Sequence, residues 1–289
     1  MPTPREIRRR IRSVRNTAQI TRAMEMVAAS KMRRAQQHVL ATRPYAERIR
    51  AMIGDLAAMG DAEEQARYPL LAKRPIQRSQ IILITSDRGL AGAFNTNVIR
   101  RAIQFMTDER PESLENIDVV TIGRKGRDFL TRYGRPLVAS FTDVGDYPTL
   151  ESIRPVVRIA TDDFVAGKVD AVYVVYTRFI NTLRQVPEVL QVLPIEAPPG
   201  TDEVTDYIFE PSPEAVLEAL LPRFVEVQIY QALLESIASE QSARMVAMRN
   251  ATDNARELVS ELTLTYNKAR QAQITREVTE IAAGAAALG

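Results

Sequence analysis

The feature that most constrains this chain of 289 residues is an apolar repeat of 3.5 residues near each end. A spacing that alternates between four and three residues is the seam of a coiled coil, whereas a helix on a globular core has a broader apolar face. Several seam residues are alanine, so two helices can approach closely. Near the N-terminus the seam positions are Ile7, Ile11, Val14, Ala18, Thr21, Glu25, Ala28, Met32, Ala35 and Val39.

A second helix is predicted from Ser212, with serine as its N-cap, Pro213 at the first position and Glu214 in the first turn. Its seam has the same period and continues almost to the C-terminus. The seam positions are Leu217, Leu220, Phe224, Val227, Gln231, Leu234, Ala238, Gln241, Met245, Met248, Thr252, Ala255, Val259, Leu262, Tyr266 and Ala269.

Proline and glycine suggest where these helices begin, bend and end. Pro4 suits a helix start, Pro44 should kink the first helix or mark its frayed end, and Gly54 and Gly60 should end it. Pro222 is early enough to kink rather than break the second helix. At 1.5 Å per residue the second helix is roughly 100 Å long and the first roughly 70 Å. The longer helix must therefore extend into solvent or into a partner.

The C-terminal tip favours a partner. It ends in Ala282-Ala283-Gly284-Ala285-Ala286-Ala287-Leu288. A bare tip of small apolar residues would fray or aggregate alone, but inside a close sleeve such side chains touch without locking. A frayed helical tail is the alternative interpretation of the same composition.

The formal net charge of +2 conceals an asymmetry between the ends. Residues 1–50 hold 13 Arg and Lys against 3 Asp and Glu, a net of +10, and residues 201–289 hold 7 against 14, a net of −7. A basic N-terminal region alone would suggest a nucleic-acid partner. Opposite charges at the two ends instead favour attraction between the two terminal helices.

Between the helices the apolar period changes and strands alternate with helices, which indicates a mostly parallel sheet with right-handed crossovers. The last strand is expected to be a hairpin partner of the one before it. The expected strands are 81–85, 118–122, 137–141, 171–176 and 186–195, and the expected helices are 95–106, 124–133 and 151–166.

Such sheets often bind nucleotides at the first strand–helix turn. The Gly89/Gly92 loop lies at that turn, and residues 123–126 could seat a phosphate at a helix N-terminus, but neither stretch has a complete phosphate-binding motif. We therefore favour the other explanation of both stretches, which is tight turns that need glycine.

Composition excludes several kinds of site. The chain has no cysteine and one histidine, His38, so thiol chemistry and any site that needs two imidazoles are excluded. His38 lies in a helical pattern and is expected to be a solvated surface residue. No carboxylate pair, catalytic triad or metal-ligand cluster stands out, no cofactor is expected, and no apolar run reaches the ~18 residues that span a bilayer.

Several stretches together resemble the gamma subunit of F-type ATP synthases over essentially the whole chain. The N-terminal helix has Ile20-Thr21-Arg22-Ala23-Met24-Glu25-Met26-Val27-Ala28-Ala29-Ser30-Lys31-Met32-Arg33, and the central domain has Ser86-Asp87-Arg88-Gly89-Leu90 followed by Gly92, Phe94 and Asn95. The C-terminal helix has matching stretches at residues 239–248, 251–255 and 266–272, with Ile274, Thr275 and Glu277 beyond them.

The resemblance implies a fold and a function. The expected fold is a long antiparallel coiled coil of the N- and C-terminal helices with a central Rossmann-like α/β domain that contains a mostly parallel five-stranded sheet. The expected function is that of a non-catalytic central-stalk rotor, which couples ion-driven rotation to conformational changes at the catalytic beta subunits. The implied partners are the alpha, beta and epsilon subunits and the membrane c-ring, at the cytoplasmic face of a bacterial membrane, peripheral and not inserted.

The family's contact residues can be carried over position by position. Contacts between rotor and stator fall on Arg270, Gln271, Thr275 and Glu277 near the tip, and on Met24 and Lys31 in the first helix. In the family these face loops of the beta subunits, one of them acidic. The contact with the c-ring and epsilon would include Tyr207. For each position, the alternative is a helix-surface residue that is held by the partner helix.

The expected divisions of the chain are an N-terminal coiled-coil helix at 1–60, a linker at 61–79, a central α/β domain at 80–200, a foot loop at 201–211 and a C-terminal coiled-coil helix at 212–289. Two other function classes stay open. One is a nucleotide-binding α/β enzyme with a helical dimerisation arm. The other is a nucleic-acid binder that uses the Arg-rich first helix.

Overall fold

The computed structural model describes residues 3–59, 68–109, 116–196, 210 and 212–288. The chain divides into two compact units. One, here called the α/β unit, comprises Ala29–Ala243; the other, here called the two-helix unit, comprises Met1–Ala28 and Arg244–Gly289. Helices α1 (Pro4–Met59) and α6 (Pro213–Leu288) each contribute residues to both units.

The α/β unit is built on a five-stranded sheet with the order β3-β2-β1-β4-β5. The first four strands pair in parallel, and β5 pairs antiparallel with β4 at the edge, as predicted. The predicted alternation of strands and helices is therefore confirmed. The strands are β1 (Ser79–Ile84), β2 (Ile117–Ile122), β3 (Ala139–Phe141), β4 (Ala171–Phe179) and β5 (Gln185–Leu193).

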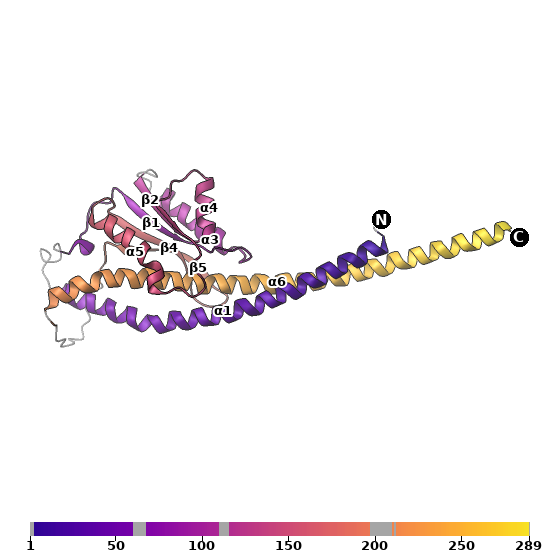
Figure 1. Cartoon of the computed structure of the whole chain (residues 1–289), viewed down its shortest axis with the longest axis horizontal. Coiled ribbons are helices and arrows are strands. Elements are labelled where there is room, and N and C mark those ends of the chain that lie inside the picture. The colour runs from indigo at the N-terminus through magenta and orange to yellow at the C-terminus, as the bar shows by residue number, and fades with distance from the viewer. Residues whose placement is uncertain (1–2, 60–67, 110–115, 197–209, 211, 289) are drawn as a thin grey trace. The chain divides into compact units, whose positions relative to one another are not determined.

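Helices cover both faces of this sheet (Figure 1). One face packs against α3 (Phe94–Gln104) and α4 (Arg124–Arg132), and the other against α5 (Leu150–Val165) and α6. Alternate residues of β1 point to opposite faces of the sheet. Ile81 therefore belongs to the apolar cluster on the side of α3 and α4, and Ile82 to the cluster on the side of α5 and α6. A strand that is apolar along its whole length is expected where helices cover both faces of the sheet. The unit also contains a short 3-10 helix, η1 (Pro69–Leu71), and a short π-helix, η2 (Phe105–Glu109), directly after α3.

Within the α/β unit, α6 is buried on two sides. Its seam residues pack against α1, where Val39, Ile49 and Ile53 belong to the same apolar cluster. The heptad prediction identified that seam but missed the second apolar face of α6, which lies on the opposite side of the helix and packs against the sheet. The residues of this second face are Val225, Ile229, Ala232, Leu233 and Ile237, all buried.

Helix α1 continues through two of its expected breaks. It includes Pro44 in its interior, and it ends at Met59, directly before Gly60 as predicted. The prediction that Gly54 also ends the helix is wrong. Gly54 is buried inside α1, where its neighbours Ile53 and Leu56 are almost fully buried. The free energy gained by burying these side chains exceeds the cost of about 1 kcal/mol for a glycine in a helix interior.

Candidate functional site

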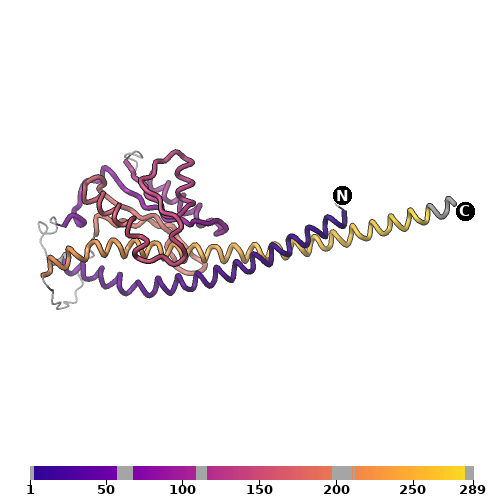
Figure 2. The backbone as a smooth tube through the Cα atoms, viewed as in Figure 1, coloured from indigo at the N-terminus to yellow at the C-terminus, as the bar shows by residue number. Residues whose placement is uncertain are grey.

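The two-helix unit consists of two helices that run antiparallel side by side (Figure 2). Thr21 contacts Thr252 and Glu25 contacts Arg249, so residue numbers rise on α1 as they fall on α6. The predicted seam is confirmed at each of its positions in this unit, because every one is buried or half-buried. On α6 the half-buried seam positions continue from Val259 to Ala269.

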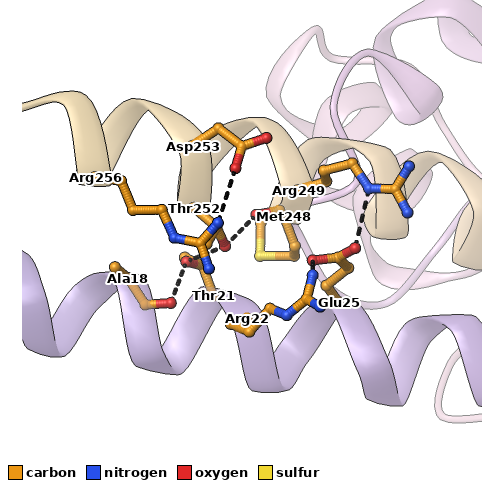
Figure 3. A network of polar contacts seen from close by, with 9 residues as sticks. All are labelled: Ala18, Thr21, Arg22, Glu25, Met248, Arg249, Thr252, Asp253 and Arg256. Carbon is orange, nitrogen blue, oxygen red and sulfur yellow. Dashed lines mark hydrogen bonds and ion pairs between the residues drawn. The ribbon is translucent and has the colours of Figure 1, made fainter.

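Two polar layers interrupt this seam (Figure 3). In the first, the Oγ1 atoms of Thr21 and Thr252 lie 2.7 Å apart. Each hydroxyl also has a carbonyl acceptor in its own helix, Met248 for Thr252 at 2.8 Å and Ala18 for Thr21 at 3.2 Å, and either hydroxyl can be the donor between the two. Thr21 and Thr252 are only 9% and 2% exposed, so a shift in register would break a buried contact between the two hydroxyls. The threonine layer therefore specifies how the two helices align.

The second layer is an ion-pair network around Glu25, whose side chain is only 6% exposed. Its carboxylate accepts from Arg249 of α6 at 3.0 Å and from Arg22 of α1 at 2.8 Å. Burial alone would raise the pKa of Glu25, but the hydrogen bonds from Arg249 and Arg22 outweigh burial and lower that pKa. The Glu25–Arg249 pair places the acid on α1 and the base on α6. This is the reverse of the arrangement expected from a basic N-terminal helix and an acidic C-terminal helix.

Beyond Ala269, the described side chains of α6 have no covering helix. Residues 270–283 are exposed on every side although the helix continues. Arg270, Gln271, Thr275 and Glu277, the predicted contact residues, all lie in this stretch. The hydroxyl of Thr275 donates to the Gln271 carbonyl at 3.0 Å. The carboxylate of Glu277 accepts from Gln273 at 2.8 Å, so both polar groups are satisfied within the helix.

The exposed tip also has an apolar stripe. Ile274, Val278 and Ile281 follow at intervals of four and three, and they are 50%, 59% and 72% exposed. Residues at this spacing share one helix face. An apolar stripe open to solvent on a single helix marks a surface that another molecule covers. The sequence analysis identified small residues at the tip but not this stripe, although its spacing is readable from the sequence.

A second exposed stripe surrounds Met24 on α1. Ile20 is 61% exposed, Val27 is 54% exposed, and the half-buried Met24 lies between them at helical spacing. Met24 therefore lies between the seam and this apolar stripe. The structure brings this predicted contact residue together with apolar neighbours that the sequence analysis did not single out.

The other two predicted contacts lie elsewhere. Lys31 belongs to the α/β unit, where its ammonium donates to Asp146 at 2.6 Å. Tyr207 lies outside the described residues.

The turn where a sheet of this type could bind a phosphate is filled by the chain's own side chains. The Asp87 carboxylate accepts from the Arg124 amide at 2.9 Å and from the Asp143 amide at 3.0 Å. The hydroxyl of Thr85 accepts from the Gly126 amide at 2.8 Å. A Cβ on Gly123 would lie 2.1 Å from the Thr85 carbonyl oxygen, so glycine is needed for close packing. The amides that could hold a phosphate at α4 therefore already have partners.

Two further searches of the described residues are informative. They contain no group of three or more His, Cys, Asp or Glu side chains that could hold a metal ion. None of their helices is both long and apolar enough to cross a bilayer.

Comparison with known proteins identifies the family. Residues 3–288 match a family model described as ATP synthase. The chain is 57% identical over 290 residues to the ATP synthase gamma chain of Roseiflexus castenholzii, with 100% of this chain and 99% of that one covered. This chain belongs to the ATP synthase gamma chain family. The gamma chain of Chloroflexus aurantiacus is 56% identical over 292 residues, again with 100% and 99% covered.

Solved structures show the same architecture. The central stalk and c-ring structure of the Tetrahymena thermophila mitochondrial ATP synthase includes a chain that is 25% identical, with a TM-score of 0.62 and coverage of 80% of this chain and 99% of that chain. A chain of the Euglena gracilis mitochondrial ATP synthase (OSCP/F1/c-ring) is 20% identical, with a TM-score of 0.67 and coverage of 99% and 94%, and supports the fold alone. The predicted coiled coil with a central α/β domain is confirmed.

Proposed function

We propose that this chain is the central-stalk rotor subunit of a rotary ATP synthase and that its exposed tip turns inside a ring of partner subunits. The observation that carries the proposal is the stretch 270–283, which continues as helix with every side chain exposed. A full-length relationship to gamma chains gives that bare helix its partners, the alpha and beta subunits. The subunit is non-catalytic, and its role is mechanical.

The coupling follows from differential contact. A shaft without threefold symmetry presents a different face to each of three equivalent catalytic pockets, so their affinities for nucleotide differ at any instant. Rotation by a third of a turn permutes the three states. The energy for each change is the difference in contact free energy between states. An interlocked seam with polar layers, such as Thr21–Thr252, keeps the shaft from slipping in register as it turns.

The proposed contacts with the stator are the carried-over residues. At the tip, Arg270, Gln271, Thr275 and Glu277 flank the apolar stripe, so the tip combines apolar contact with polar groups around it. On α1, Met24 contributes through the stripe that it shares with Ile20 and Val27.

Lys31 is also proposed to face a beta-subunit loop. An ammonium has three donors, and the hydrogen bond to Asp146 uses one of them. The Lys31 side chain is 28% exposed, so part of it is available to a partner.

Tyr207, which lies outside the described residues, is proposed to contact the c-ring and the epsilon subunit. The complex would lie at the cytoplasmic face of a bacterial membrane, with this chain peripheral to the bilayer. The support for both is the family relationship.

Reconstitution tests the proposal. The purified chain is mixed with alpha and beta subunits of a related bacterial synthase, and the mixture is separated by size. The chain is expected to co-elute with them in a complex that hydrolyses ATP, whereas the chain alone should show no hydrolysis. A chain that elutes separately from an assembled head, or that binds ADP tightly and one to one by itself in equilibrium dialysis, would contradict the proposal.

A further inference from the structure

The loop between β3 and α5 contacts both long helices of the α/β unit through one carboxylate. Asp146 accepts from the Lys31 ammonium of α1 at 2.6 Å and from the Gln241 amide of α6 at 3.1 Å. Gln241 occupies a seam position and is only 2% exposed. The side-chain amide of this buried seam residue therefore serves a contact with the loop as well as its place in the seam.

The next two residues of the loop reinforce this contact. The hydroxyl of Tyr230 in α6 donates to the Pro148 carbonyl at 2.9 Å, and this bond is buried. The guanidinium carbon of Arg34 in α1 lies 5.9 Å from the ring centroid of Tyr147. Each long helix therefore contacts this short loop through two side chains.

The loop is also fixed at its start, on the side of the sheet. The Asp143 carboxylate accepts two hydrogen bonds from Arg124 of α4, each 2.8 Å. The Asp143 amide donates to Asp87, in the loop after β1, at 3.0 Å. The loop is thus attached to the carboxyl edge of the sheet at one end and to both long helices at the other.

We propose that Lys31, Asp146 and Gln241 form a clasp that transmits torque between the α/β domain and the two long helices. Apolar packing between these elements is non-directional and opposes separation more than sliding. Hydrogen bonds to two oxygens of one carboxylate depend on direction, so they oppose sliding and rotation. The proposal rests on the rotor function above and assigns Asp146 and Gln241 as positioning residues for it.

The test separates rotation under load from rotation without load. In a head of alpha, beta and this chain alone, the α/β domain carries no load, so Asp146→Ala should leave ATP hydrolysis unchanged. In the whole synthase in vesicles, ATP-driven proton pumping should fall, by up to about fivefold if the clasp contributes as much as a well-formed partly exposed ion pair. Asp146→Glu keeps a carboxylate that can accept from both Lys31 and Gln241, so it should retain most of the pumping, and it leaves Lys31 unchanged for its proposed contact with the stator.

Asp162→Ala is the matched control, because the Asp162 side chain is 71% exposed and pairs at 3.9 Å with Arg158 of its own helix, α5. Normal pumping by Asp146→Ala would overturn the clasp. So would a parallel loss of pumping, head hydrolysis and thermal stability, or a loss of pumping in Asp146→Glu as large as in Asp146→Ala, since either outcome reflects a merely structural role. If the wild-type chain itself fails to assemble an active head, the rotor function fails and not the clasp.

Discussion

Helix α6 occupies two different environments in this molecule. In the α/β unit its residues are buried by α1 on one side and by the sheet on the other, as Val225 and Ile229 show with no exposure. In the two-helix unit only one stripe is covered, and beyond Ala269 no stripe is. The difference teaches that one continuous helix serves as a core element at one end and as a contact surface at the other.

Carboxylates in the two regions show the same difference. Glu25, in the two-helix unit, has two arginine partners that lower its pKa. Glu235, in the α/β unit, is 7% exposed and its Oε2 has no hydrogen-bond partner, and burial raises its pKa. The carboxylate of Glu25 reaches exposed arginines at the border of the seam, whereas the Oε2 atom of Glu235 has no such partner.

The largest expected effect is on packing. Ile229→Ala should lower the free energy of unfolding by about 2–5 kcal/mol, because Ile229 is fully buried between helix and sheet. Leu264→Ala removes a similar side chain that is 62% exposed, and should change the free energy of unfolding by about 0.5 kcal/mol or less. Urea unfolding of the full chain, followed by circular dichroism, measures both. Equal losses for the two variants would contradict the comparison.

The next effect concerns function in the two-helix unit. Met24→Lys places a charge in the apolar stripe between Ile20 and Val27, and should lower ATP-driven proton pumping by about tenfold, because the charge loses its hydration against the stator. Met24→Leu keeps the stripe apolar and is the control. Pumping is followed in vesicles by fluorescence quenching of a pH-sensitive dye. Wild-type pumping by the lysine variant would remove Met24 from the contact surface.

The smallest effects depend on pH and have opposite signs. A raised pKa in the folded state means that ionised Glu235 costs stability as pH rises through that pKa, so Glu235→Gln should stabilise the chain at pH 7 by about 1 kcal/mol. A lowered pKa means that Glu25 stabilises the fold above its unfolded pKa of about 4.3 and loses this contribution as pH falls through its folded pKa.

Glu25→Gln should therefore destabilise the chain at pH 7 by about 1 kcal/mol or less, since both arginine partners are more than half exposed. It should also reduce the dependence of stability on pH in the acid range. Urea unfolding of both variants between pH 3 and pH 8 provides the comparison. Changes of the same sign at pH 7 would show that the two carboxylates do not differ in the stated way.

The sequence predicted what depends on short-range periodicity. The seam from Ile7 to Val39 and the alternating strands and helices are local patterns, and both are confirmed. The second face of α6 was missed because its partner strands are distant in the chain. The role of Asp87 was missed for the same reason, since the amides that it accepts from belong to Arg124 and Asp143. Lys31 could be named as a contact residue, but its pairing with Asp146 requires the fold.

The central claim is that the exposed tip of α6 is covered only when partner subunits assemble around it. Since the chain has no cysteine, a single Val278→Cys variant gives one thiol in the apolar stripe, and Tyr133→Cys gives a matched thiol at a position that is 71% exposed in the α/β unit. Maleimide labelling of each is timed in the free chain and in the assembled head of alpha, beta and this chain. We expect both thiols to react quickly in the free chain and only the tip thiol to become protected in the head; a tip thiol that reacts equally fast in both states would contradict the account.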